Sequence, residues 1–181
     1  MSGGSIIVRQ SKNSKLISNE NIIIGNTVLY GATSGKLYAS GQAGERFAVR
    51  NSGSLAIVEG CGAHGCEYMT GGNVIILGQV GDNFGAGMTG GMAFIYDPEN
   101  KFEDFVNPTS IIWQSIETDY WKNFLKENLQ DFVKETNSKI AEKIINNFEK
   151  ELFNFKQICP IEMLDKLENP ITFKSIVKKV S

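Results

Sequence analysis

Residues 60–65 are the part of this chain whose residue types and spacing most resemble a chemical site. They read G-C-G-A-H-G, which fits the dinucleotide-binding pattern G-x-G-x-x-G, and they follow a strand-like run at 55–58. A dinucleotide site also needs a helix after the last glycine, because the helix N-terminus binds the pyrophosphate. Only residues 66–70 precede Gly71 and the next strand-like run. We therefore interpret the motif as a turn between strands and expect no cofactor-binding residue in it.

The same segment holds three side chains that can bind zinc: Cys61, His64 and Cys66. A structural zinc site uses four ligands, and the remaining cysteine, Cys159, lies more than 90 residues further along the chain. The alternative is that the cysteines are buried as small apolar side chains and that His64 is hydrogen-bonded at a turn. We favour this alternative and expect no metal ligand in the chain.

A charged group forms the third candidate site. Glu45, Arg46 and Arg50 lie close together in the sequence, and Glu59 and Glu67 follow one repeat later. These side chains could form a ladder of charges between stacked strands or a ligand site. Nothing nearby supplies a nucleophile or a base in a defined arrangement, so we favour the structural role and expect no catalytic residue.

Overall composition limits the partners that the chain can have. The chain has 181 residues and a formal net charge of −2, whereas nucleic-acid binding requires a basic face. Its apolar runs are far shorter than the roughly 18 residues that span a bilayer. The three cysteines are too few for a disulfide framework and suit a reducing compartment. We expect a cytoplasmic protein that contacts neither nucleic acid nor membrane.

The chain divides into two halves of different composition. All 19 glycines precede residue 92, and all four prolines lie at or after Pro98. Glycine destabilises helix interiors by about 1 kcal/mol per residue, so the first half is not expected to be helical. We predict one unit over residues 1–97 and a helical C-terminal tail over residues 98–181.

The first half repeats with a period of 18 or 19 residues. Two series of glycines keep this spacing, and the tetrapeptide at 69–72 recurs, residue for residue, at 88–91. A short β-prone run follows each glycine of one series, and no repeat has room for a helix. A fixed period of this length predicts a solenoid of stacked strands with about five coils. An antiparallel sandwich with glycine turns is the alternative, but sandwiches do not keep a constant period. The glycines expected at the coil corners, for a positive φ or a close backbone approach, are Gly35, Gly44, Gly53, Gly62, Gly71, Gly72, Gly81, Gly90 and Gly91.

Helical periodicity governs the second half. Apolar residues recur along one face over residues 117–133 and again over 138–155, where Ser138 is a suitable N-cap. A further short helix is expected over 161–167. Two or three helices make a thin core by themselves, so their apolar faces should pack on the solenoid or on a partner.

The first four residues read M-S-G-G, which closely matches the M-T-G-G tetrapeptide that precedes a strand at 69–72 and at 88–91. We therefore expect the chain to begin within a coil and its first strand to present an unpaired edge. Either a preceding part of a longer chain or another subunit would cover such an edge.

Residues 24–35, 44–53 and 58–72 together resemble the C-terminal glycine-repeat domain of the glutamate synthase large subunit, and the helical tail resembles that protein's C-terminus more loosely. The resemblance implies a right-handed parallel β-helix without catalytic residues. It also implies an enzyme whose other domains carry the activity: an amidotransferase domain and a synthase domain with FMN and an iron–sulfur cluster. Those upstream domains and the small NADPH-oxidising subunit are the partners that the resemblance implies.

Two other functions fit a solenoid of this kind. The chain could be a separate β-helix subunit of another oxidoreductase, such as formylmethanofuran dehydrogenase, or an independent enzyme acting on polysaccharide. The latter needs a groove of carboxylates and aromatic side chains, and residues 1–97 contain only six acidic residues. The length of the resemblance favours a non-catalytic structural segment of glutamate synthase.

Overall fold

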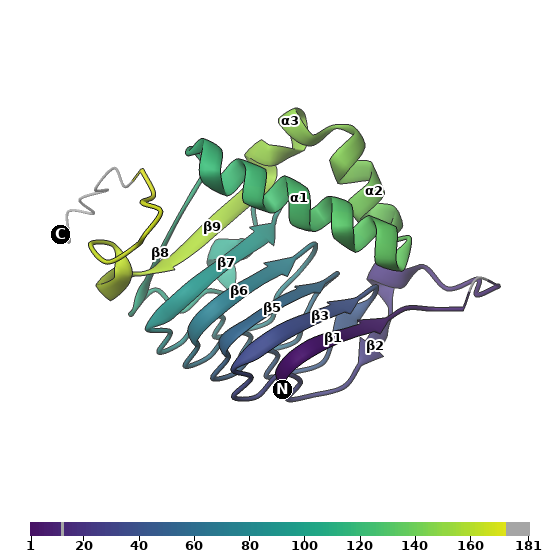
Figure 1. The fold of residues 1–181 in the computed structure, drawn as a ribbon, viewed down its shortest axis with the longest axis horizontal. Helices are drawn as coiled ribbons and strands as arrows, with labels where there is room; N and C mark the ends of the chain where they lie inside the picture. The colour runs from purple at the N-terminus through teal and green to yellow at the C-terminus, as the bar shows by residue number, and fades with distance from the viewer. Residues whose placement is uncertain (12, 173–181) are drawn as a thin grey trace.

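Five parallel strands stacked one above the other form the body of the molecule (Figure 1). The structure is a computed structural model that describes residues 1–11 and 13–172. The predicted parallel β-solenoid is confirmed, with about four turns instead of five. The stacked strands, in spatial order, are β1 (Ser2–Val8), β3 (Ser34–Ala39), β5 (Ser52–Val58), β6 (Thr70–Ile76) and β7 (Gly90–Tyr96).

Strand register confirms the predicted period in three of the turns. Lys36 pairs with Leu55, Leu55 with Asn73, and Asn73 with Met92, which are steps of 19, 18 and 19 residues. The first turn is longer, because Ser5 pairs with Lys36. Its additional residues form a loop, a 3-10 turn at Ser18–Glu20 and the strand β2 (Ile22–Ile24), which pairs with β4 (Gln42–Ala43) in a small second sheet.

The C-terminal parts of β3, β5, β6 and β7 are buried on both faces, which explains why these parts are continuous apolar runs. Side chains such as Ala56 and Val58 point into the solenoid, where they join the core around Phe47 and Phe84. Their neighbour Ile57 points outward into a second core, which lies beneath the helices.

Three of the four positions of the repeated tetrapeptide have a distinct structural role. Met69 is fully buried in the solenoid core. A Cβ on Gly71 would lie 2.3 Å from the carbonyl oxygen of Ser52 in the preceding coil, so no larger residue fits there. Gly72 has a φ of +81° at a bulge that opens the strand. The repeat at 88–91 behaves in the same way, with a buried Met88.

The expected corner glycines fall into two groups. Only Gly35, Gly72 and Gly91 have a positive φ. The others sit where a Cβ would press on the neighbouring coil; the nearest atoms lie between 2.0 and 3.0 Å from it. They are Gly44, Gly53, Gly62, Gly71, Gly81 and Gly90.

The outer arcs are the segments 26–33, 44–51, 62–69 and 81–88, which connect one stacked strand to the next. Most of their residues with a positive φ are not glycine. In the arc before β5, Arg46, Ala48 and Arg50 have φ values of +61°, +58° and +55°. The arc before β6 repeats this alternation at positions 64, 66 and 68. Such residues cost roughly 1 kcal/mol or more each in this conformation. Their amides compensate by bonding alternately to the two neighbouring coils: Arg46 to Ala63, Ala48 to Val28.

The C-terminal half contains strands as well as helices. The predicted helix over 117–133 is present as α1 (Asp119–Thr136), but the predicted helix over 138–155 is wrong in length. It ends as α2 (Lys139–Asn146) and is followed by the single turn α3 (Phe148–Glu151). Phe155 instead begins β9 (Phe155–Pro160), which pairs antiparallel with β7 and with β8 (Ile111–Gln114).

Residues from Phe155 onward form a strand despite their helical periodicity, because they hydrogen-bond to the open edge of β7, where Phe155 pairs with Tyr96. The short helix expected over 161–167 is only a 3-10 turn at Ile161–Met163. The helical faces were expected to pack on the solenoid or on a partner, and they pack on the solenoid. Leu125, Leu129 and Phe132 are fully buried in one core with Ile57 and Ile75, and Figure 1 shows α1 lying across the stacked strands.

We expect Gly71→Ala to destabilise the fold by about 3 kcal/mol, because its methyl group would overlap a backbone oxygen of the preceding coil. Gly25→Ala is the matched control, since a Cβ on Gly25 meets nothing within 4 Å. Urea denaturation of both variants measures the difference. Equal stability of the two variants would contradict the role assigned to close coil contact.

Candidate functional site

Residues 60–65, the glycine motif, form part of the turn between β5 and β6, and no helix follows them. The thiols of Cys61 and Cys66 face the solenoid core. Burial raises the pKa of Cys61 to about 12 and the pKa of Cys66 well above its usual value. Zinc binds the thiolate form, which this burial disfavours. His64 stays near the surface, 3.5 Å from a carboxylate oxygen of Glu67.

The predicted charged group is divided between two faces of the molecule. Arg46 and Arg50 lie exposed on the outer arcs, where the Arg50 guanidinium lies 5.8 Å from the centre of the Tyr30 ring. Glu45 is also exposed. Glu59 instead lies under the helices and is 1% exposed, so it is no rung of a surface ladder.

Glu59 forms a buried polar contact between the solenoid and the helical layer. It directly follows β5, in register with Ser40 of the preceding coil. Its Oε1 accepts hydrogen bonds from the Ser40 hydroxyl at 3.0 Å and from the Ser138 hydroxyl at 2.5 Å. Ser138 caps α2, because its Oγ also accepts from the amide of Ala141. Among the described residues, Oε2 of Glu59 has no hydrogen-bond partner.

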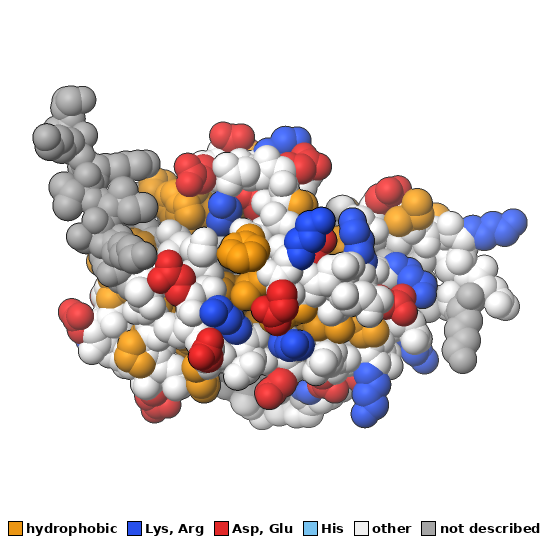
Figure 2. Space-filling model, turned by 90° about the horizontal axis from the view of Figure 1, so that it is seen from above, with side chains coloured by type: hydrophobic (Ala, Val, Ile, Leu, Met, Phe, Trp, Pro, Cys, Tyr) orange, Lys and Arg blue, Asp and Glu red, His pale blue; other side chains and the backbone are white. Residues whose placement is uncertain are grey.

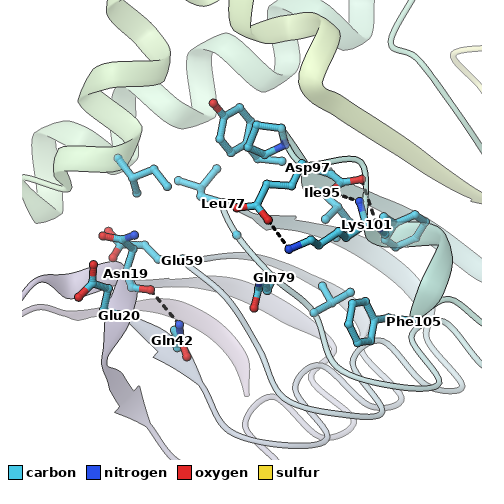
Figure 3. Close-up of a pocket in the computed structure, with 17 residues that line it drawn as sticks. Asn19, Glu20, Gln42, Glu59, Leu77, Gln79, Ile95, Asp97, Lys101 and Phe105 are labelled. Atoms are coloured by element: carbon cyan, nitrogen blue, oxygen red, sulfur yellow. Dashed lines mark hydrogen bonds and ion pairs between the residues drawn. The ribbon is translucent and has the colours of Figure 1, made fainter.

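A cleft of about 620 Å³ lies at the C-terminal ends of β5, β6 and β7, with Glu59 in its wall and Ile140 of α2 at its rim. Figure 3 shows Glu20 and Glu59 on one side of this cleft and Asp97 and Lys101 on the other. Lys101 pairs with Glu99 at 2.5 Å. Apolar side chains complete the walls: Leu77, Val80, Ile95, Phe102, Phe105 and Ile140.

Two further polar contacts fasten the helices to the solenoid. On β3, Tyr38 donates to Asp131 of α1 at 3.0 Å, and Lys36 pairs with the same oxygen at 2.6 Å. At the end of β7, Tyr96 donates to Glu151 of α3 at 2.6 Å. With the contact between Glu59 and Ser138, each of the three helices is held to a different coil, and α1 also accepts a hydrogen bond from Arg9 through the carbonyl of Glu135.

These contacts shift the ionisation of their members. The hydrogen bond from Lys36 lowers the pKa of Asp131, and the hydrogen bond from Tyr96 lowers the pKa of Glu151. Burial, and then the bond to Glu151, raise the pKa of Tyr96 to about 12. Both carboxylates are therefore held ionised and both phenols neutral. They serve as structural contacts, and neither pair is poised for proton transfer near neutral pH.

Sequence reasoning missed the role of Glu59. A signal was available in its position, because Glu59 directly follows the apolar run at 55–58. In the next two coils, the equivalent positions are occupied by the buried residues Leu77 and Tyr96. A charged residue in a column of buried side chains indicates a buried site.

The whole fold corresponds to a known sequence family. Residues 1–161 match the family model described as "GXGXG motif". The chain belongs to the GXGXG motif family. Among its curated relatives is the glutamate synthase [NADPH] large chain of Azospirillum brasilense, which is 55% identical to this chain over 171 residues. These residues make up 94% of this chain and 11% of the relative.

Other relatives carry the names of other electron donors. The glutamate synthase [NADH] of Schizosaccharomyces pombe is 44% identical over 99% of this chain and 8% of its own length. The ferredoxin-dependent glutamate synthase of Antithamnion is 45% identical over 88% of this chain and 10% of its own length. This GXGXG chain therefore spans about a tenth of the length of the relatives that it matches.

Charges on the helical face are mixed, as Figure 2 shows from above: acidic and basic side chains are interspersed, with apolar side chains between them.

Within residues 1–11 and 13–172, no helix has both the length and the apolar character needed to cross a membrane.

Tyr96→Phe should lower the free energy of unfolding by about 1 kcal/mol near neutral pH, because it removes the bond to Glu151. The pKa of Glu151 is lowered in the folded state, so this stabilisation is present above the usual Glu pKa and is lost as the pH falls below it. The pKa of Tyr96 is raised, so the stabilisation is also lost as the pH rises from 10 towards 12.

Chemical denaturation of wild type and Tyr96→Phe across this pH range measures the effect. The difference between the two proteins should be constant around neutrality and shrink at both extremes. A difference that did not change with pH would show that the contact is not ionic in the way described.

Proposed function

We propose that this chain is a non-catalytic structural segment of a glutamate synthase, which makes glutamate from glutamine and 2-oxoglutarate by a reductive reaction. The observation that carries the proposal is the match of 88–99% of the chain, at 44–55% identity, to a segment of glutamate synthases. In this role the solenoid supports the domains that do the chemistry. It contributes rigidity and surface to them.

Similarity to relatives with different electron donors supports a role away from the donor. Relatives named for NADPH, NADH and ferredoxin match this chain at 55%, 44% and 45% identity. A segment that bound the donor would be expected to differ between these classes. The chain is thus proposed to leave donor binding to other parts of the enzyme, including the small NADPH-oxidising subunit where one exists.

The proposed partners are the amidotransferase domain and the synthase domain of the same enzyme, in a cytoplasmic setting. FMN and the iron–sulfur cluster would belong to the synthase domain, and this segment would bind neither. The chemistry of the described side chains supports this assignment. Its cysteines Cys61, Cys66 and Cys159 are buried with raised pKa values, which is unfavourable for cluster ligation.

The N-terminal end of the solenoid is proposed as the surface that meets a neighbouring domain. Within the described residues, β1 pairs only with β3, so its other edge is open. Ile6 faces the end of the solenoid core and is 49% exposed, and Ile22 of β2 is 67% exposed. An open parallel edge with apolar residues is a template for a further coil.

The isolated chain should therefore self-associate through β1. Sedimentation velocity at increasing concentration should show dimers or larger species, and Ile6→Lys should shift the population to monomer, because it places a charge at the core end. Phe153→Lys makes a similar change from an apolar to a charged side chain at an 80% exposed position outside β1 and serves as the control. A wild-type chain that stays monomeric at high concentration would contradict the proposal for this surface.

A segment exchange tests the proposed function directly. The matching 171 residues of the Azospirillum brasilense large chain are replaced by this chain, and glutamine-dependent NADPH oxidation is measured beside a deletion of the same segment. The exchange should retain at least roughly a tenth of the native rate, and the deletion should abolish it.

The isolated chain should show no glutaminase or glutamate synthase activity. Activity of the isolated chain would overturn its non-catalytic assignment. A deletion as active as the native enzyme would overturn the supporting role.

A further inference from the structure

We propose that the cleft at the C-terminal ends of β5, β6 and β7 is a binding site for a primary ammonium group on an aliphatic stem, with Glu59 as its counter-ion. The site is independent of the proposed structural role, because it rests on the cleft itself. Its central observation is a carboxylate that is 1% exposed, lines the cleft and has one oxygen without a hydrogen-bond partner among the described residues.

A buried carboxylate with only neutral partners is incompletely compensated. Ser40 and Ser138 both bond to Oε1, and within the described residues no Lys, Arg or His forms an ion pair with Glu59. Burying an ionised carboxylate is costly unless a positive charge accompanies it. A ligand ammonium at Oε2 would provide both the charge and the missing donor.

Charges around the cleft favour a cation. Four carboxylates and a single lysine line it. That lysine, Lys101, is already paired with Glu99, and Asp97 accepts from the amides of Lys101 and Phe102. Glu59 and Glu20 remain without an ion pair in the described part of the chain. A concave surface of one sign, with apolar walls, concentrates ions of the opposite sign.

The cleft walls select the rest of the ligand. Leu77, Ile95 and Ile140 line the same cleft as Glu59 and provide apolar surface, which suits the methylene groups of an alkyl chain. A bare metal ion fits less well, because nowhere in residues 1–11 and 13–172 do three His, Cys, Asp or Glu side chains gather as metal ligands.

Access requires a small movement of the carboxylate. Oε2 is itself covered by protein atoms, so it must turn toward the cleft to meet the ligand. The last torsion of a glutamate side chain has a broad energy profile, but the turn also moves Oε1 and lengthens the hydrogen bonds from Ser40 and Ser138. The charge-assisted hydrogen bond from the ammonium group compensates for this loss. Lysine side chains of another polypeptide and free alkylamines both carry this ammonium chemistry.

Titrations followed by ¹H–¹⁵N NMR on the 181-residue chain test the site. The probes are n-pentylammonium, 1-pentanol as its neutral counterpart, ammonium chloride, and Nα-acetyl-lysine N-methylamide as the mimic of a protein lysine. Saturable shifts of the Gly60 and Leu77 amides are expected with pentylammonium and not with pentanol. The lysine mimic should bind at least as tightly as pentylammonium if the natural source is a polypeptide, and more weakly if it is a free amine.

Variants separate binding from folding. Glu59→Gln keeps the shape and an acceptor for both serines and should weaken pentylammonium at least about tenfold, which corresponds to about 1.4 kcal/mol. Glu127→Gln makes the same change of net charge on the exposed face of α1 and should leave the affinity for pentylammonium unchanged. Ser138→Ala keeps the carboxylate and should retain binding while lowering the melting temperature.

Three results would overturn the proposal. They are equal binding of pentanol and pentylammonium, unchanged affinity in a folded Glu59→Gln, and shifts produced by ammonium chloride alone at the same concentrations.

Discussion

Direct backbone contact between successive coils is the constraint on which the rest of this structure depends. A Cβ on Gly90 would lie 2.0 Å from the carbonyl oxygen of Thr70, and Gly71 is placed in the same way against Ser52. These contacts fix the start of each strand. They place Met69 and Met88 inside the core, and the bulge glycines Gly72 and Gly91 come directly after Gly71 and Gly90. Once the strands are in register, the arcs follow, because left-handed residues such as Ala48 and Cys66 are held by hydrogen bonds to the adjacent coils.

The outer face of the stacked strands then determines the C-terminal half. Ile57, Ile75 and Phe94 form an apolar stripe that α1 must cover, since an exposed stripe of that size would be a site of association. Packing alone does not orient a helix on such a surface. The polar contacts at Asp131, Ser138 and Glu151 do so, because each requires a specific partner on a specific coil. In the proposed setting of a glutamate synthase, this fastening would make the solenoid and its helices one rigid surface for the neighbouring domains.

The parts of the fold that the sequence predicts are those set by local periodicity. The 18–19-residue repeat, the tetrapeptide glycines and helix α1 all follow from spacing along the chain. The parts it misses depend on distant partners. Phe155 has helical spacing to Leu152 but is recruited by the edge of β7, and Arg46 accepts a left-handed backbone because neighbouring coils hold its amide. Glu59 could not be distinguished from Glu45 by residue type. Its position after the apolar run at 55–58 was the one signal in the sequence, and the helices that cover it in the structure explain why it is buried while Glu45 is exposed.

Native-state hydrogen exchange tests most directly the claim that solenoid and helices form one cooperative unit across the predicted division at residue 97. The amides of Val74 and Ile75 in β6 and of Leu125 and Leu129 in α1 are compared as denaturant is added. The account predicts that both groups exchange only through global unfolding, with the same free energy of opening. Exchange of the α1 amides at a free energy several kcal/mol below that of β6 would show an independent tail and contradict the account.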